Sequence, residues 1–333
     1  MGKILIITHS ADNDAVTSVM EHLSAAGEMP VRFNVDRYPL VTRLTSEFHG
    51  HQRRLWLEDG STPQSLEDLS AVWYRRSYHI ADGLDQVLEK PYLSPATGEI
   101  RRTLFGMLES LHCFQLERYS TYRRLDSKEE QLRIAAECGL LTPATCITNS
   151  PERLEAFMQS VKGPIVAKMQ SAFAIQQDGQ EQVVFTSEIR QDHLQQLPQL
   201  RFCPMTFQEK LEKELELRVN IVGKEIFAFS IDSQQQPGAE TDWRKEGASL
   251  AVQWKPYTLP GAVAEGLSRL MDRYGLNYGA IDLILTPEGK YYFLELNAAG
   301  EFFWLDKLCD GAISRQLAAV LAGSAERRKP LIS

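Results

Sequence analysis

The chain of 333 residues is long enough for two or three domains, and 43% hydrophobic with 24% charged residues is an ordinary globular composition. The formal net charge of −8 excludes a nucleic-acid binder that relies on bulk positive charge, and it favours a basic peptide as a partner. No apolar run approaches the length of a membrane span, so we expect no membrane association.

The N-terminal stretch MGKILIITHS begins directly with a strand-like run and carries no signal-peptide cleavage pattern. Five cysteines are scattered along the chain without the paired spacing of a metal site. An odd number of cysteines without an export signal predicts reduced thiols and a cytoplasmic protein.

Residues 1–120 predict an N-terminal α/β domain. A strand, a helix and a second strand follow one another from Lys3 onward, which is typical of an α/β layer. No G-x-G-x-x-G follows the first strand, so we do not expect a dinucleotide site. The predicted elements are strands at residues 3–8, 31–35 and 70–75, helices at 12–26 and 98–113, and a hairpin of the runs 43–48 and 53–57.

Residues 121–205 predict a compact central domain. Ser127 or Asp126 is a candidate N-cap for a helix that ends at Gly139. Asp178 followed by Gly179 predicts a tight hairpin turn. The predicted elements are helices at residues 126–138, 150–161 and 192–197, and strands at 143–148 and 164–169.

Residues 206–325 predict a C-terminal domain of strands and helices. Its strands are expected at residues 205–209, 215–222 and 225–231, followed by a helix at 263–274, a hairpin from 280 to 297 and a closing helix at 313–322. The tail from Ala325 onward is predicted to fray.

The stretch from Asp282 to Trp304, DLILTPEGKYYFLELNAAGEFFW, carries the clearest chemical pattern. Because alternate side chains of a strand share a face, Glu295 and Asn297 point the same way, and Asp282 on the paired run can face them. Three oxygen donors among apolar neighbours fit a hard cation such as Mg²⁺, which also takes phosphates and waters as ligands. The alternative is a solvated hairpin face with ordinary charges.

Other polar side chains lie on or beside apolar strands. Lys168 precedes the polar hairpin and either places a point charge on phosphates, with the hairpin as a lid, or extends to water. Glu216 and Arg218 alternate with apolar residues, so they can face one cleft or form a cross-strand ion pair. Lys128 opens a helix and on its own is read as a surface residue.

Two further segments are candidates for nucleotide contacts. Residues 208–211 (QEKL) end an apolar strand, where backbone groups can read an adenine edge. Arg244 lies in the irregular polar segment DWRKE, and its alternative is simple surface exposure.

Taken together, these segments resemble the ATP-grasp superfamily, and specifically the microviridin-type ATP-grasp peptide ligases (graspetide macrocyclases). The resemblance covers nearly the whole chain. It rests on the segments FNVDRYP, AVWYRR, FCPMTFQEKL…LELRVNIVG, DWRKEG, LNYGAIDLILTP and FLELNAAGEFFWL, in that order. Ala298 departs from the pattern, because many ATP-grasp sequences have proline after the asparagine; the metal ligands are unaffected, but the stiffness of the loop can differ.

The resemblance implies an ATP-grasp fold, in the α/β class with α+β subdomains, behind an N-terminal α/β pre-ATP-grasp domain. It also implies ATP and Mg²⁺ as cofactors and a role for each matching residue. The implied roles are phosphate contacts for Lys128 and Lys168, the adenine pocket for Gln208, Glu209 and Leu211, the ribose for Glu216, phosphate or acyl phosphate for Arg218 and Arg244, Mg²⁺ for Asp282, Glu295 and Asn297, and peptide contacts for Arg75, Arg76 and Asp192.

The function that the resemblance implies is ATP-dependent closure of side-chain ester links in a ribosomal precursor peptide, which has a leader and a core. A core carboxylate becomes an acyl phosphate, and a hydroxyl of the same peptide displaces phosphate. A homodimer is implied as well. The alternatives are an amide-forming macrocyclase, another ATP-grasp carboxylate–amine ligase acting on small amino acids or a protein C-terminus, and a nucleotide-binding regulatory module without catalysis.

Overall fold

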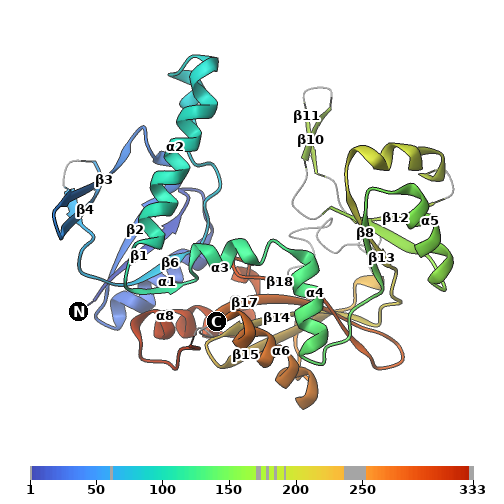
Figure 1. Ribbon diagram of the computed structural model, residues 1–333. Helices are drawn as coiled ribbons and strands as arrows, with labels where there is room; N and C mark the ends of the chain where they lie inside the picture. The colour runs from blue at the N-terminus through green and yellow to red at the C-terminus, as the bar shows by residue number, and fades with distance from the viewer. Residues whose placement is uncertain are drawn as a thin grey trace.

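The computed structural model describes residues 2–60, 63–169, 174–177, 180–183, 186–190, 193–235 and 253–329. A parallel sheet forms the N-terminal part of the molecule (Figure 1). Its strand order is β2 (Met29–Asn34), β1 (Lys3–Thr8), β6 (Leu69–Tyr74) and β7 (Phe114–Leu116). β1 reads KILIIT and is almost wholly buried, as expected for a parallel strand covered on both faces.

Two long helices pack beside this sheet. Helix α1 (Asp14–Ala25) begins at Asn13, whose side chain accepts a hydrogen bond from the Ala15 N–H, and it buries a stripe that includes Val16 and Leu23. Helix α2 (Lys90–Glu109) starts earlier than predicted, because its buried residues all lie in its second half and its exposed first half shows no apolar periodicity. The short helices here are η1 (Val35–Arg37), η2 (Leu84–Gln86) and α3 (Tyr119–Arg124).

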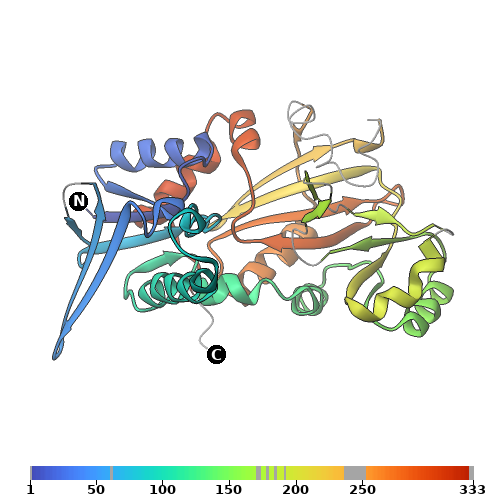
Figure 2. The same ribbon diagram turned by 90° about the horizontal axis from the view of Figure 1, so that it is seen from above.

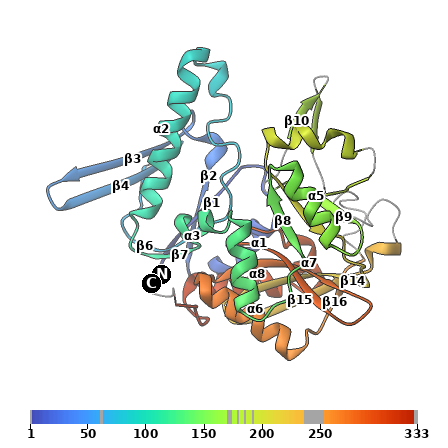
Figure 3. The same ribbon diagram turned by 45° about the vertical axis from the view of Figure 1, so that its right-hand side comes forward.

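A narrow antiparallel sheet projects from the N-terminal part (Figure 3). It consists of β3 (Thr42–His49), β4 (Gln52–Asp59) and β5 (Pro63–Ser65). The predicted hairpin is therefore present and is longer than expected. Its tip carries Phe48, which is 69% exposed.

The central part is a small antiparallel sheet with helices on one side. Its strand order is β12 (Ser187–Glu188), β9 (Ile165–Lys168), β13 (Met205–Glu209) and β8 (Thr145–Thr148), with helices α5 (Pro151–Ser160) and η3 (His193–Phe202). The predicted hairpin pairs β10 (Ala174–Gln177) with β11 (Gln180–Val183). Its turn residues, Asp178 and Gly179, lie outside the described residues.

The C-terminal part is a larger antiparallel sheet. Its strand order is β16 (Lys255–Pro256), β15 (Glu225–Ile231), β14 (Leu215–Val222), β17 (Tyr278–Leu285) and β18 (Tyr291–Asn297). The helices are α4 (Lys128–Glu137), α6 (Gly261–Tyr274), α7 (Phe303–Leu308), α8 (Ala312–Ala322) and the short η4 (Ser233–Gln235). Of the two candidate caps of α4, Ser127 is the one whose side chain accepts from the Glu130 N–H.

Two helices pack outside the segment in which they occur. Helix α4 contacts β18 and α6 of the C-terminal sheet, although it precedes the central sheet in the chain. Helix α8 packs against α1, so the first and last long helices share one core (Figures 1 and 2). These contacts cross the predicted domain limits near residues 120 and 205, and those limits stay predictions.

The predicted fraying of the tail is wrong for the part that the structure describes. Arg328 is only 3% exposed and donates hydrogen bonds to the carbonyls of Gly223 and Ser268. It also forms an ion pair with Asp272. These contacts fix the segment before residue 330 to the C-terminal sheet and α6. Among the described helices, none has the length and hydropathy needed to cross a membrane.

Candidate active site

The two faces of the C-terminal sheet differ in chemistry. On β14, Leu217 and Val219 point into the apolar core that α4 and α6 cover. Their neighbours Glu216 and Arg218 therefore point to the opposite face, as the alternation predicted. The polar candidates of β17 and β18 meet on this second face.

Asp282 and Glu295 are directly opposed in the register of β17 and β18. The register shifts immediately afterwards, because Leu283 pairs with Phe293 and leaves Leu294 as an extra residue. Such bulges re-aim side chains and are common beside active sites. Asn297 lies opposite Ala280, and its Oδ1 accepts a hydrogen bond from the Ala299 N–H at 2.9 Å.

Each of these carboxylates contacts a cation. Arg218 Nη1 donates to Asp282 Oδ1 at 2.7 Å, and Lys128 Nζ lies 3.0 Å from Glu295 Oε2. Burial lowers the pKa of Arg218, but Asp282 raises it, and the net direction is upward. Arg218 therefore stays charged at the centre of the polar face.

Glu216 is buried two residues before Arg218. Its Oε1 lies 3.0 Å from Lys213 Nζ and accepts a hydrogen bond from Ser233 Oγ at 2.6 Å. Desolvation raises the pKa of this carboxyl above its ordinary value, although Lys213 and Ser233 act in the opposite direction. A hydroxyl-bearing ligand placed here would meet an acceptor held in a fixed orientation.

The remaining nucleotide candidates lie on the central sheet. Lys168 Nζ donates to Gln208 Oε1 at 2.7 Å, and Gln208 Nε2 donates to Thr145 Oγ1 at 2.9 Å. Glu209 exchanges hydrogen bonds with the backbone of Ala144, through its own N–H and its carboxylate. Leu211 follows in a half-buried position. Arg244 and Asp192 lie outside the described residues.

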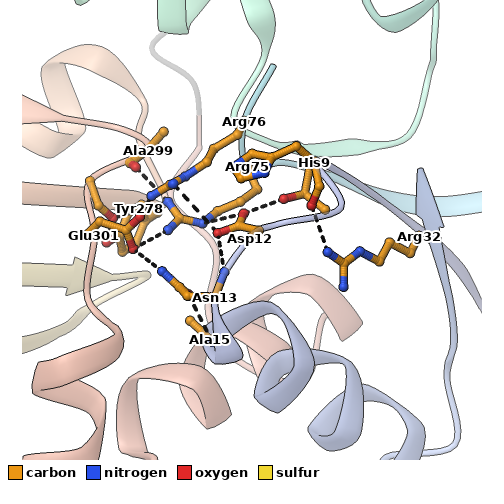
Figure 4. Close-up of polar contacts among 12 residues, drawn as sticks. His9, Asp12, Asn13, Ala15, Arg32, Arg75, Arg76, Tyr278, Ala299 and Glu301 are labelled. Atoms are coloured by element: carbon orange, nitrogen blue, oxygen red, sulfur yellow. Dashed lines mark hydrogen bonds and ion pairs between the residues drawn. The ribbon is translucent and has the colours of Figure 1, made fainter. Parts of the chain in front are cut away.

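Arg75 and Arg76 follow β6 at the junction with the C-terminal sheet (Figure 4). Both contact Glu301, which comes shortly after β18, and both lie 3.8 Å from Asp12. Arg75 is 1% exposed. Contact with a peptide carboxylate stays a prediction for these two residues, because in the structure their acidic partners belong to the chain itself.

The N-terminal residues 3–123 match the family model of the MvdD pre-ATP-grasp domain. The whole chain aligns with a solved RiPP-associated ATP-grasp ligase from Chryseobacterium gregarium, in complex with ADP and a leader and core peptide. The two share 48% identity over 100% of both chains, with a TM-score of 0.96. The chain belongs to the RiPP-associated ATP-grasp ligases. The expected ATP-grasp fold with an N-terminal pre-ATP-grasp domain is thereby confirmed.

Two macrocyclases from Microcystis aeruginosa are also similar to this ligase. MdnC, solved with the precursor peptide MdnA, shares 38% identity over 97% of this chain and 100% of its own, with a TM-score of 0.88. MdnB shares 32% identity over 96% of this chain and 99% of its own, with a TM-score of 0.81. No curated protein matches the sequence.

The polar face of the ligase fits a magnesium–nucleotide site by its donor set. Within the described ranges, no three His, Cys, Asp or Glu side chains gather as a complete metal cage. Two opposed carboxylates with the neighbouring amide of Asn297 instead suit Mg²⁺, which takes few protein oxygens and completes its shell with phosphates and waters.

Sequence reasoning missed several residues that hold this site of the ligase together. Lys213 and Ser233 orient Glu216, and Tyr278 OH donates to the side chain of Asn220 and to the Gly300 carbonyl. Asn220 carried a usable signal, because it continues the alternation that starts at Glu216 and Arg218. The others meet only through the tertiary fold.

Proposed function

We propose that this ligase uses ATP and Mg²⁺ to activate a side-chain carboxylate of a ribosomally made precursor peptide and then closes a macrocyclic link. The carrying observation is the 48% identity over the full chain with a ligase solved with ADP and a leader and core peptide. The opposed carboxylates of Asp282 and Glu295, beside Arg218 and Lys128, support it. A cytoplasmic location is part of the proposal and agrees with the five free cysteines.

In the first step, a core carboxylate oxygen attacks the γ-phosphorus of ATP, the bond to the bridging oxygen breaks, and ADP leaves. In the second, a hydroxyl oxygen attacks the acyl carbon, inorganic phosphate leaves, and the hydroxyl proton is lost. Bound Mg²⁺ supplies neutralisation of charge on the phosphates.

The residues of the chain bind and orient these groups. Asp282, Glu295 and Asn297 hold the metal, and Lys128 and Lys168 neutralise phosphate oxygens. Arg218 and Arg244 stabilise charge on the transferring phosphoryl group, where a fixed guanidinium costs little reorganisation. Glu216 binds the ribose, while Gln208, Glu209 and Leu211 line the adenine pocket.

The proposed product is an ester between a Ser or Thr hydroxyl and an Asp or Glu carboxylate. The segments FQEKL…ELR and GEFFWL resemble those of ester-forming members. An acyl phosphate reacts with hydroxyls and amines alike, so the choice between them depends on positioning, where a misplacement of about 1 Å can cost roughly 10²-fold in rate.

The test incubates the purified ligase with ATP, Mg²⁺ and a precursor peptide taken from a short reading frame beside its gene. We expect the peptide to lose one water mass for each link, and we expect mild alkali to restore those masses, because esters hydrolyse there and amides persist. Reactions without ATP and with a core peptide lacking its leader are the controls.

Two outcomes would contradict parts of this proposal. Alkali-resistant dehydration with a lysine mapped into the link would replace the ester with an amide. Turnover of ATP with small amino acids, but with no such peptide, would refute the precursor peptide as substrate.

A further inference from the structure

The structure connects the N-terminal sheet to the loop that follows the proposed metal strand. Arg75 is the first residue after β6, and its side chain is buried. Its Nη1 donates to the Ala299 carbonyl at 2.7 Å and lies 3.4 Å from the Gly300 carbonyl. Its Nη2 donates to Glu301 Oε2 at 2.7 Å (Figure 4). One guanidinium therefore holds three consecutive residues of the loop.

The same loop orients a proposed metal ligand. The Ala299 N–H donates to Asn297 Oδ1, and the Ala299 carbonyl accepts from Arg75. The peptide group on each side of Ala299 is thereby fixed. A movement of Arg75 is transmitted through a single residue to the amide of Asn297.

The opposite side of the loop is fixed as closely. Tyr278 OH donates to the Gly300 carbonyl at 2.7 Å, and Arg218 Nη2 donates to the Glu301 carbonyl at 3.2 Å. A Cβ added at Gly300 would lie 2.3 Å from the Ala280 Cβ, which no packing tolerates. The loop therefore has little freedom to compensate for a lost contact.

The guanidinium of Arg75 is itself held in place. Asp12, at 3.8 Å from Nε, provides a buried negative charge, and Asn13 Nδ2 donates to the same Glu301 oxygen that Arg75 contacts. Burial tends to raise the pKa of Asp12, but Arg75 and the Thr8 hydroxyl lower it, and the net direction is downward. A charged Asp12 therefore faces the arginine.

We propose that Arg75 is a positioning residue for the metal site, and that it acts through Ala299 on Asn297. This inference rests on the proposed function. Arginine is required because its planar fork reaches the carbonyl of Ala299 and the carboxylate of Glu301 together, whereas a lysine has one nitrogen. Contacts that orient metal ligands in this way commonly account for 10–100-fold in metal affinity.

The test measures ADP binding by calorimetry across a series of Mg²⁺ concentrations. In Arg75→Lys we expect the half-saturating Mg²⁺ concentration to rise at least about tenfold, with ADP affinity in the absence of Mg²⁺ unchanged. An Mg²⁺ dependence equal to that of the wild type would overturn the proposal.

Arg328→Lys is the matched control, because Arg328 is also a buried arginine that donates to backbone carbonyls, but those carbonyls belong to the β14–β15 turn and to α6. We expect a lower melting temperature and the wild-type Mg²⁺ dependence. A shift as large as that of Arg75→Lys would show a general loss of stability and overturn the positioning role.

Glu301→Gln keeps the proposal testable if Arg75→Lys does not fold, since it weakens the same contact from the loop side. We expect Glu301→Gln to raise the half-saturating Mg²⁺ concentration as well. If that concentration equals the wild-type value, the inference is overturned. If the wild-type protein does not bind ADP, the proposed function itself is refuted. That outcome is distinct from a failure of the positioning role, in which the wild type binds ADP and the variants keep its Mg²⁺ dependence.

Discussion

At the scale of single residues, the opposed carboxylates of Asp282 and Glu295 differ in how deeply their cationic partners are buried. Asp282 is the partner of Arg218, whose side chain is 8% exposed, whereas Glu295 pairs with Lys128, whose side chain is 25% exposed. Removing one partner of a buried ion pair leaves an uncompensated charge and can cost about 3–5 kcal/mol. We therefore expect the loss of Asp282 to affect stability as well as the proposed metal binding, so a substitution of Glu295 tests the metal site with less effect on the fold.

We predict that Glu295→Gln lowers the rate of peptide-dependent ATP hydrolysis at least about 100-fold, because weaker binding of Mg²⁺ leaves the γ-phosphate misplaced. Its melting temperature should stay near that of the wild type, while Asp282→Asn should lose both activity and stability. Steady-state phosphate release and thermal unfolding are the measurements. Glu288→Gln, in the exposed turn of the same hairpin, is the control, and wild-type turnover by Glu295→Gln would refute the metal assignment.

At the scale of elements, we predict that the central part binds the leader. The resemblance implies leader recognition near the β10–β11 hairpin and the helix after it, a stretch of sequence that contains Glu188 and Asp192. In the structure Glu188 forms an ion pair with Lys210 at 2.6 Å, and η3 ends at Phe202, which is 82% exposed. Exposed ion pairs contribute only about 0–1 kcal/mol, so an apolar anchor must supply most of the affinity.

We predict that Phe202→Ala weakens leader binding about tenfold, as expected for an aromatic anchor. Asp192→Ala should weaken it by no more than about fivefold. Titration of a labelled leader peptide checks both variants, and ATP binding should be unchanged in each. Phe48→Ala removes another exposed phenylalanine, from the distant β3–β4 hairpin, and is the control; if it weakens leader binding as much as Phe202→Ala does, this site is wrong.

At the scale of the whole molecule, Glu117 connects the segment after β7 to the start of β17. It is buried, with 4% exposure, and accepts hydrogen bonds from the N–H groups of Asn277 and Tyr278 at 2.5 and 2.8 Å. Burial raises its pKa to about 8. The two hydrogen bonds lower the pKa, but by less than burial raises it. The connection between the two sheets therefore depends on pH.

The folded protein keeps this proton up to about pH 8, whereas the unfolded chain loses it near the ordinary value of 4.5. The raised pKa of Glu117 therefore stabilises the folded state fully below pH 4.5, and this contribution is lost as the pH rises to about 8. The free energy of unfolding falls by at most about 1.4 kcal/mol per pH unit in this range. We predict that Glu117→Gln removes this decline, so that the free energy of unfolding of the variant increases relative to that of the wild type as pH rises. Urea unfolding between about pH 5 and about pH 8 tests it, with exposed Glu225→Gln as the control; a variant-to-wild-type difference that is constant with pH would contradict it.

Local pattern was sufficient for much of the fold. The strands β13, β14 and β15 have the predicted limits, and the alternation of two strands around a turn predicted that Asp282 can face Glu295, which the strand register confirms. The resemblance supplied the superfamily, which no periodicity could. The predicted homodimer is still untested.

The contacts that sequence reasoning did not find join distant parts of the chain. The contact of Arg75 with Glu301 and the burial of Arg328 are examples. Neither has a local signature: Arg75 follows an ordinary strand, and Arg328 lies in a short polar tail. Such contacts are decided by which surfaces the tertiary fold brings together.

The packing of α1 against α8 has a consequence for the ligase during its synthesis. The apolar stripe of α1 leaves the ribosome before α8 does, and α8, which packs against it, follows only after the whole intervening chain has been translated. At roughly 5–20 residues per second, that interval is on the order of tens of seconds. During this time the nascent N-terminal sheet presents an uncovered apolar surface, which makes it a natural client for ribosome-associated chaperones, and co-expression with such chaperones is the rational first response to poor yields of soluble ligase.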